Sequence, residues 1–314
     1  MRILLASDGS FGASIAEALL CSLSWPAGTE VEVVMVVDPR PPRPYMYPLV
    51  PDQTAYESFM NAGAASAVES VAARIAGLGF RTRTAVLRGR TVDRLVERGI
   101  EIDASLIICG SRGHGPLRSG AFGSVGRAVA EQAGSSVLIA RQTLATHVLL
   151  ASDGSPTAFA AEQAVMTWPA FASLPIDLVR VVATEPHVPW HAQPAPAEEC
   201  GRPGWTVARL QACGRHATET LLVGEPAKTV LCHAADSRAD LIVVGTHDRS
   251  RLGRLWHGSV AAQIAARGSS SVLIARDRDL SSEQRRRGTR ERVREPFFRI
   301  FLRRSRVGSA KPEV

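Results

Sequence analysis

The chain has 314 residues, of which 45% are hydrophobic and 21% charged. This length suits two domains, each large enough to bury its own core. No apolar run approaches the ~18 to 20 residues of a membrane helix, and the N-terminus does not resemble a signal peptide, so we expect a cytoplasmic protein. The net charge is +7, but the last 38 residues hold 12 Lys and Arg against 6 Asp and Glu, so the rest of the chain is nearly neutral.

An internal repeat organises the sequence. Residues 4–10 read LLASDGS and recur at 149–155, whereas residues 135–141 read SSVLIAR and recur at 270–276. The offset falls from 145 to 135, so the second copy lacks ten residues, which we place in a Pro-rich loop between its first and third strands. The predicted domains are residues 1–142 and 146–276, followed by a basic tail, 277–314.

The tail has two interpretations. Its arginines and its apolar cluster around Phe297 and Phe298 could bind an anionic membrane surface or a nucleic acid, or could form an amphipathic partner helix. Charge runs at termini are more often solvated and disordered, and this interpretation is favoured.

Segments with the apolar pattern of strands alternate with segments of helical spacing within each copy. Apolar segments of strand length in the first copy are residues 3–6, 31–37, 82–87, 106–109 and 137–140, with Ala-rich helical segments at 15–23, 55–78 and 92–100 between them. The strand segments of the second copy are residues 147–151, 176–182, 218–223, 241–244 and 272–275. Near-continuous apolar strands alternating with helices predict an α/β protein made of two doubly wound, five-stranded parallel-sheet domains.

A glycine-rich loop follows the fourth strand of the first copy. Gly110, Gly113, Gly123 and Ser124 give the spacing G-x2-G-x9-G-S, and a helix is predicted to begin near Ser124. Glycines let backbone amides approach an anion, and a helix N-terminus adds free N–H groups and a positive dipole end. This pattern favours a phosphate-binding loop over its alternative, a mobile surface connection.

Asp8 ends the first strand and is the second candidate feature. If strands one and four are neighbours where the strand order reverses, Asp8 faces the glycine-rich loop and can bind a ribose hydroxyl or an adenine amino group. Arg112, His114 and Arg127 could add positive charge nearby. The alternative is that Asp8, like Asp153 in the second copy, only forms a turn or caps the first helix.

These motifs resemble the universal stress protein family in tandem form. The resemblance rests on ASDGS at residues 6–10 and 151–155, on the loop from Gly110 to Ser124, and on SVLIAR at 136–141 and 271–276. It implies the strand order 3-2-1-4-5 and pairing of the two copies through their fifth strands, with a homodimer as a further option. It also implies ATP as ligand, with Mg²⁺ held by the phosphates, and no metal site of the protein's own. The implied ATP contacts are Asp8, Val36, Gly110, Gly113, Gly123, Ser124 and Val125.

The second copy departs from this pattern. It retains Asp153, Gly245, Gly258 and Ser259, but Asp248 replaces the second glycine of the loop. A carboxylate beside phosphate oxygens is repelled, by about 1 kcal/mol or several depending on the effective dielectric. We therefore expect a weaker second site that binds a triphosphate poorly or not at all.

No catalytic residues are predicted. The sequence shows no nucleophile with its base, no paired carboxylates and no Walker lysine. The five cysteines are odd in number and lack C-x-x-C spacing, which predicts reduced thiols. The favoured function is a regulatory ATP-binding protein with no or slow hydrolysis, whose loaded state a protein partner senses. The alternative is an ATP-cleaving enzyme of the adenylyl-transfer or pyrophosphatase type on the same fold.

Overall fold

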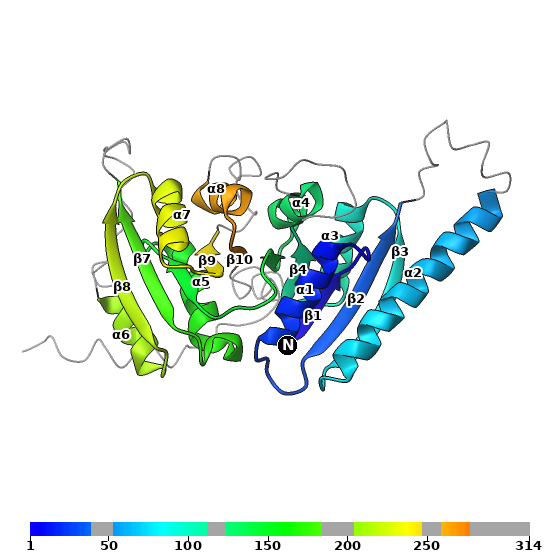
Figure 1. The fold of residues 1–314 in the computed structure, drawn as a ribbon, viewed down its shortest axis with the longest axis horizontal. Coiled ribbons are helices and arrows are strands. Elements are labelled where there is room, and N and C mark those ends of the chain that lie inside the picture. Colours follow the sequence, from blue (N-terminus) through cyan, green and yellow to red (C-terminus); the bar gives the residue numbers. More distant parts are fainter. Residues whose placement is uncertain (39–52, 112–122, 184–203, 247–258, 277–314) are drawn as a thin grey trace, which may run out of the picture. The chain divides into compact units, whose positions relative to one another are not determined.

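The computed structural model describes residues 1–38, 53–111, 123–183, 204–246 and 259–276 (Figure 1). The predicted phosphate contact Gly113, its second-copy counterpart Asp248, the predicted second-site residue Gly258 and the basic tail lie outside the described residues.

The first repeat contains five strands and four helices in its described part. The strands are β1 (Arg2–Ala6), β2 (Glu30–Val37), β3 (Arg81–Arg88), β4 (Leu106–Gly110) and β5 (Ser136–Ala140). The helices are α1 (Phe11–Ser22), α2 (Gln53–Ala76), α3 (Thr91–Glu101) and α4 (Ser124–Gln132).

The second repeat follows the same order. Its strands are β6 (Val148–Ala151), β7 (Ile176–Val182), β8 (Ala217–Val223), β9 (Leu241–Gly245) and β10 (Ser271–Ala275). Its helices are α5 (Pro156–Thr167), α6 (Trp205–Ala212), α7 (Pro226–Asp236) and α8 (Val260–Arg267), with a short 3₁₀ turn at Pro169–Phe171.

All ten strands form one sheet in the order β3-β2-β1-β4-β5-β10-β9-β6-β7-β8. Each half has the order 3-2-1-4-5, and every pairing is parallel except that of β5 with β10. The expected fold and the expected pairing through the fifth strands are therefore confirmed. Leu138 lies opposite Leu273, its counterpart at the 135-residue offset, so the two repeats pair as a pseudo-symmetric dimer within the chain.

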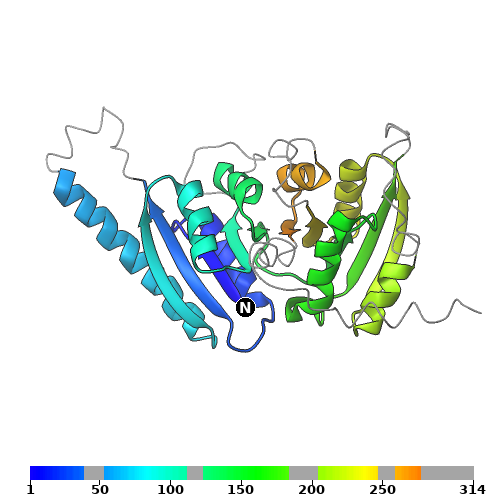
Figure 2. The same ribbon diagram turned by 180° about the vertical axis from the view of Figure 1, so that it is seen from behind.

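Helices cover both faces of each half of the sheet (Figures 1 and 2). Ile3 and Leu5 of β1 belong to the core on the α1 and α2 side, whereas Leu4 between them belongs to the core on the α3 and α4 side. Because successive residues of a strand point to opposite faces, a strand covered on both faces must be apolar throughout. This explains the continuous apolar runs in the sequence.

The ASDGS motif ends a strand, turns the chain and begins a helix. Gly9 has a φ of +73° and Gly154 one of +75°, a left-handed conformation that glycine adopts without steric cost. Ser10 then caps α1, its hydroxyl accepting a hydrogen bond from the N–H of Ala13 at 3.2 Å. Ser155 caps α5 in the same way. The exact repetition of this motif thus reflects backbone geometry at both sites.

The SSVLIAR motif joins the two repeats through a reciprocal pair of arginines. The backbone N–H of Arg141 donates to the hydroxyl of Ser271, and that of Arg276 donates to the hydroxyl of Ser136, both at 3.1 Å. The guanidinium of Arg276 also donates to the carbonyls of Ser135, at 3.1 Å, and of Ala130. Arg141 makes the equivalent bonds to residues 270 and 265. We call these two side chains the arginine clamps.

Candidate functional site

The first repeat brings its candidate residues to the carboxyl ends of neighbouring strands. β1 pairs with β2 on one side and with β4 on the other, so the strand order reverses beside β1. Asp8 follows β1 and Gly110 ends β4, while Val36 lies near the end of β2, partly buried against the core of the α3 and α4 side. Ligands of open α/β sheets bind at such a reversal. The structure thus brings Asp8 and Gly110 to one edge, as expected, and ligand binding at this edge stays a prediction.

Asp8 forms a turn as well as facing this edge. Its Oδ1 accepts a hydrogen bond from the N–H of Ser10 at 3.0 Å, and its side chain is exposed. Asp153 does the same toward Ser155 at 2.9 Å. The turn interpretation of both aspartates therefore holds, and a ligand contact of Asp8 would be made in addition to it.

Gly110 is explained by packing within the protein. A Cβ at this position would collide with the carbonyl group of Gly12 at the start of α1. Gly245, its counterpart, lies equally close to the backbone of Thr157 in α5. A glycine is therefore required at both positions by the approach of strand to helix, whether or not a phosphate binds. This role cannot be seen in a loop motif alone.

Helix α4 presents its N-terminus to the same edge. The N–H of Gly123 donates to the carbonyl of Ser111 at 2.8 Å, so the glycine-rich loop begins and ends beside β4. Gly123 is the N-cap, Ser124 is the first helical residue and Val125 the second, and no described side chain caps the helix. An uncapped first turn leaves backbone N–H groups without an intrahelical acceptor, which suits an anion.

Helix α8 begins differently in the second repeat. Ser259, the counterpart of Ser124, is itself the N-cap, and its hydroxyl accepts from the N–H of Ala262 at 3.1 Å. The protein therefore satisfies one of the free N–H groups of α8 with its own side chain. This difference in the helix start, which sequence reasoning missed, disfavours an anion at α8. The carboxylate of Asp248 is expected to have the same effect.

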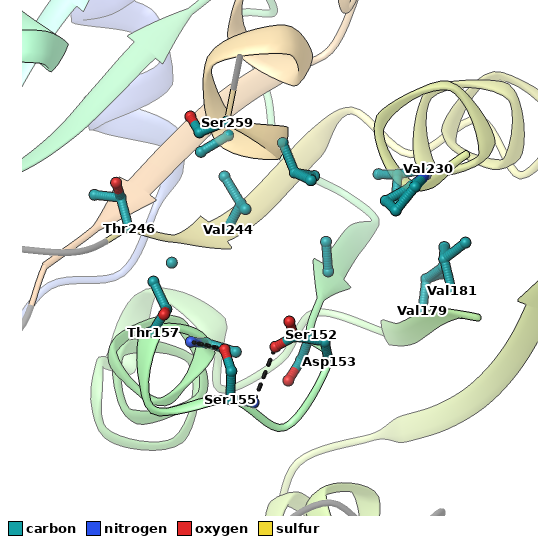
Figure 3. A pocket seen from close by; sticks show the side chains of 16 residues that line it. Ser152, Asp153, Ser155, Thr157, Val179, Val181, Val230, Val244, Thr246 and Ser259 are labelled. Atoms are coloured by element: carbon teal, nitrogen blue, oxygen red, sulfur yellow. Dashed lines mark hydrogen bonds between the residues drawn. The ribbon is translucent and has the colours of Figure 1, made fainter. Parts of the chain in front are cut away.

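A pocket of about 290 Å³ lies at the carboxyl ends of the strands in the second repeat (Figure 3). Val179, Val181 and Val230 gather at one side of it, whereas Thr246 and Ser259 lie at the other (Figure 3). Three of the four residues predicted for the second site line this pocket, namely Asp153, Gly245 and Ser259. Val181, the counterpart of Val36, lines it as well. An apolar side and a polar side suit a ligand with an aromatic and a polar part.

A buried glutamate stabilises one side of this pocket through hydrogen bonds. Glu162 of α5 is 2% exposed, and it accepts hydrogen bonds from the hydroxyls of Ser152 at 2.6 Å and Thr206 at 3.1 Å. Ser152 lines the pocket and accepts from the N–H of Gly154, so Glu162 fixes the turn that carries Asp153. From the sequence of the helix alone, this glutamate would be expected to face solvent. Its burial is seen only from its hydrogen bonds to residues outside the helix.

The charge of Arg127 and the thiol of Cys109 near the first candidate site are both affected by other groups of the protein. Arg127 forms an ion pair with Glu131 at 2.9 Å, so its charge is not directed to a ligand alone. Cys109, near the carboxyl end of β4, is buried, and burial raises the pKa of its thiol to about 12, whereas the charge of Arg141 acts in the opposite direction. The described cysteines are all free thiols, as expected: Cys21, Cys109, Cys213 and Cys232.

Among the described residues, no group of three or more His, Cys, Asp or Glu side chains is placed to hold a metal ion. None of the helices in the described ranges is long and apolar enough to cross a membrane.

A doubly wound parallel sheet whose strand order reverses beside a pocket defines the class of α/β proteins that take ligands at this edge. The chain belongs to the universal stress protein family, whose family model matches residues 1–141 and again residues 145–276.

Solved structures agree on the fold. A universal stress protein from Archaeoglobus fulgidus DSM 4304 aligns with a TM-score of 0.63 and 19% identity, over 88% of this chain and 98% of that one. A protein of unknown function from Pseudomonas aeruginosa PAO1 aligns with a TM-score of 0.58 and 14% identity, over 90% and 94%.

Among curated proteins, the stress response protein NhaX of Bacillus subtilis (strain 168) is 39% identical over 56 residues. The match covers 18% of this chain and about a third, 34%, of NhaX.

Proposed function

We propose that this chain is a nucleotide-binding regulator of a stress response, which binds ATP mainly in its first repeat and hydrolyses it slowly or not at all. The observation that carries the proposal is the uncapped N-terminus of α4, beside the ends of β1 and β4. Membership of the universal stress protein family and the match to a stress response protein support the biological role.

The residues at this edge fit ATP. The free N–H groups of Ser124 and Val125 would donate hydrogen bonds to phosphate oxygens, aided by the positive end of the α4 dipole. Asp8 would accept a hydrogen bond from a ribose or adenine donor in addition to the one from the N–H of Ser10, and Val36 would contact the base. Mg²⁺ would be held by the phosphates, and Gly113 is proposed as a further backbone contact.

The test compares ATP binding by the full chain and by Gly113→Asp, which copies the change that the second repeat carries. We expect ATP to copurify with the native chain and to be lost from Gly113→Asp. Gly134→Asp is the matched control, because Gly134 lies past the other end of α4 and a Cβ there meets no atom within 4 Å. Retention of ATP by Gly113→Asp at native affinity would contradict the proposal.

The reverse substitution probes the difference between repeats. Asp248→Gly removes the repelling carboxylate, so we expect isothermal titration calorimetry to show weak additional ATP binding beyond one site per chain. The gain should remain partial because Ser259 still caps α8. Rapid release of pyrophosphate from ATP by the native chain would instead favour the enzyme alternative.

A further inference from the structure

A second hollow lies at the opposite end of the second half-sheet. Its volume is about 380 Å³, and it lies where the amino ends of β6, β7 and β8 meet the chain that follows α6. The lining residues are His147, Pro175, Ile176, Gln211, Arg215, His216, Ala217 and Thr218. It is separate from the pocket of about 290 Å³ described above, which lies at the carboxyl ends of the strands in the same repeat.

The described ionisable residues that line the hollow are Arg215, His147 and His216. No acidic side chain of the described residues lines it. Asp240, which contacts the residues before β6, is already used: its carboxylate accepts from the backbone N–H groups of Thr146 and His147 at 2.8 and 3.1 Å and from the Thr146 hydroxyl at 2.6 Å. The hollow is therefore suited to a negative charge.

Arg215 is held in place with an unused donor. One guanidinium nitrogen, Nη2, donates to the carbonyls of Met166 at 2.7 Å and Trp168 at 3.2 Å, which fixes the side chain. Its Nε–H is buried and has no acceptor among the described residues. A buried donor without a partner is costly, and an oxygen-bearing ligand or a water would satisfy it.

The first repeat lacks this arrangement. There Arg2, the counterpart of His147, forms ion pairs with Glu30 at 3.8 Å and Asp103 at 3.7 Å. The second repeat has Pro175 and Arg238 in place of these two acids, and Arg215 in place of Phe80. It also has His147, His216 and Thr218 where the first repeat has Arg2, Arg81 and Arg83. The second repeat therefore differs by lining this hollow with one anchored arginine and two histidines that have no acid opposite them among the described lining residues.

We propose that this hollow is a binding site for an oxyanion of the phosphate class, either free phosphate or a phosphomonoester. Arg215 would supply charge-assisted hydrogen bonds, and the exposed ring of His216 would add a further N–H donor. His147 is positioned by its Nδ1, which lies 3.1 Å from the carbonyl oxygen of Ser237. The site is independent of the nucleotide site in the first repeat, and its existence does not depend on the proposed function.

The test follows histidine side-chain resonances of the full chain by NMR while inorganic phosphate is added at constant ionic strength. We expect saturable shifts for His147 and His216 and none for His233, which pairs with Asp177 outside the hollow. A parallel titration with glycerol phosphate shows whether a phosphomonoester binds as well as the free ion. Shifts that do not saturate, or that occur equally in all histidines, would refute the site.

Variants separate a built site from general attraction. Arg215→Gln should weaken phosphate binding by about tenfold or more, the usual loss for a hydrogen bond to a charged group. His216→Gln, at an exposed side chain, leaves the Arg215 anchor intact and should weaken binding severalfold, which keeps the test valid if Arg215→Gln folds poorly. Lys228→Gln removes the same charge at the other end of the sheet and should change nothing. If all three variants bound phosphate with equal affinity, the attraction would be non-specific and the proposed site would be refuted.

Discussion

The arginine clamps make a quantitative prediction about how the repeats hold together. In Arg276→Ala the carbonyls of Ser135 and Ala130 lose their guanidinium donors in a region that water does not reach, because Arg276 is 8% exposed. Each hydrogen bond to a charged group contributes about 1.5 to 3 kcal/mol. Two lost bonds therefore predict a loss of about 3 kcal/mol or more in the free energy of unfolding.

The pseudo-symmetric partner supplies the comparison. Arg141 makes the same set of bonds but is only partly buried, so water replaces some of them when it is removed. We expect Arg141→Ala to cost about 1 to 2 kcal/mol. Arg90→Ala is the control, since the Arg90 side chain is 86% exposed and lies 3.9 Å from Asp93, and it should change stability by no more than about 0.5 kcal/mol.

Urea unfolding followed by tryptophan fluorescence measures all three variants. Trp25 of the first repeat lies 6.3 Å from Trp168 of the second between ring centroids, so this pair reports on the contact between repeats. In Arg276→Ala we expect the fluorescence change to occur at lower urea than in the native chain. If Arg276→Ala is as stable as Arg90→Ala, the clamps do not hold the repeats together.

Three further predictions concern the candidate site and its supports. Gly110→Ala should destabilise the first repeat, measured by thermal unfolding without nucleotide, because its Cβ collides with the backbone of α1; unchanged stability would restore a purely ligand-binding role for this glycine. Ser155→Ala removes the N-cap of α5 and should cost about 1 kcal/mol by urea unfolding, whereas no loss would mean that the cap is unimportant. Cys109 should resist alkylation at pH 8 while Cys213 and Cys232 react, as read by mass spectrometry, because a thiol with a pKa of about 12 is neutral at that pH and the thiolate is the nucleophile. Modification of all three at equal rates would contradict the burial of Cys109.

The fold could be predicted from the sequence because its signals are local and doubled. Apolar strand runs, helical spacing and two copies of the same turn each act over a few residues, and the repeat shows them twice. The contacts between repeats are different in kind. Arg276 meets Ser135 across 141 positions of sequence, so the SSVLIAR motif could be recognised but its role as a clamp could not.

The candidate site was predicted in position but not in the reasons for its residues. The reversal beside β1 follows from strand order, and Asp8 and Gly110 lie there as expected. The glycine is also required by α1, and the aspartate also forms a turn, because a strand end must satisfy its own backbone before it can serve a ligand. Glu162 was missed because its hydrogen-bond donors come from distant segments.

The difference between the repeats lies in where one helix begins. Ser124 is the first helical residue of α4, whereas Ser259 stands one position outside α8 and caps it. A hydroxyl that accepts from the first turn competes with an anion for the same N–H groups. The scaffold of strand, turn and helix is therefore equal in both repeats. The proposed preference of the first repeat for phosphate would follow from whether the protein or the ligand satisfies the helix N-terminus. On this reasoning a family member can keep both folds while only one repeat retains strong phosphate binding.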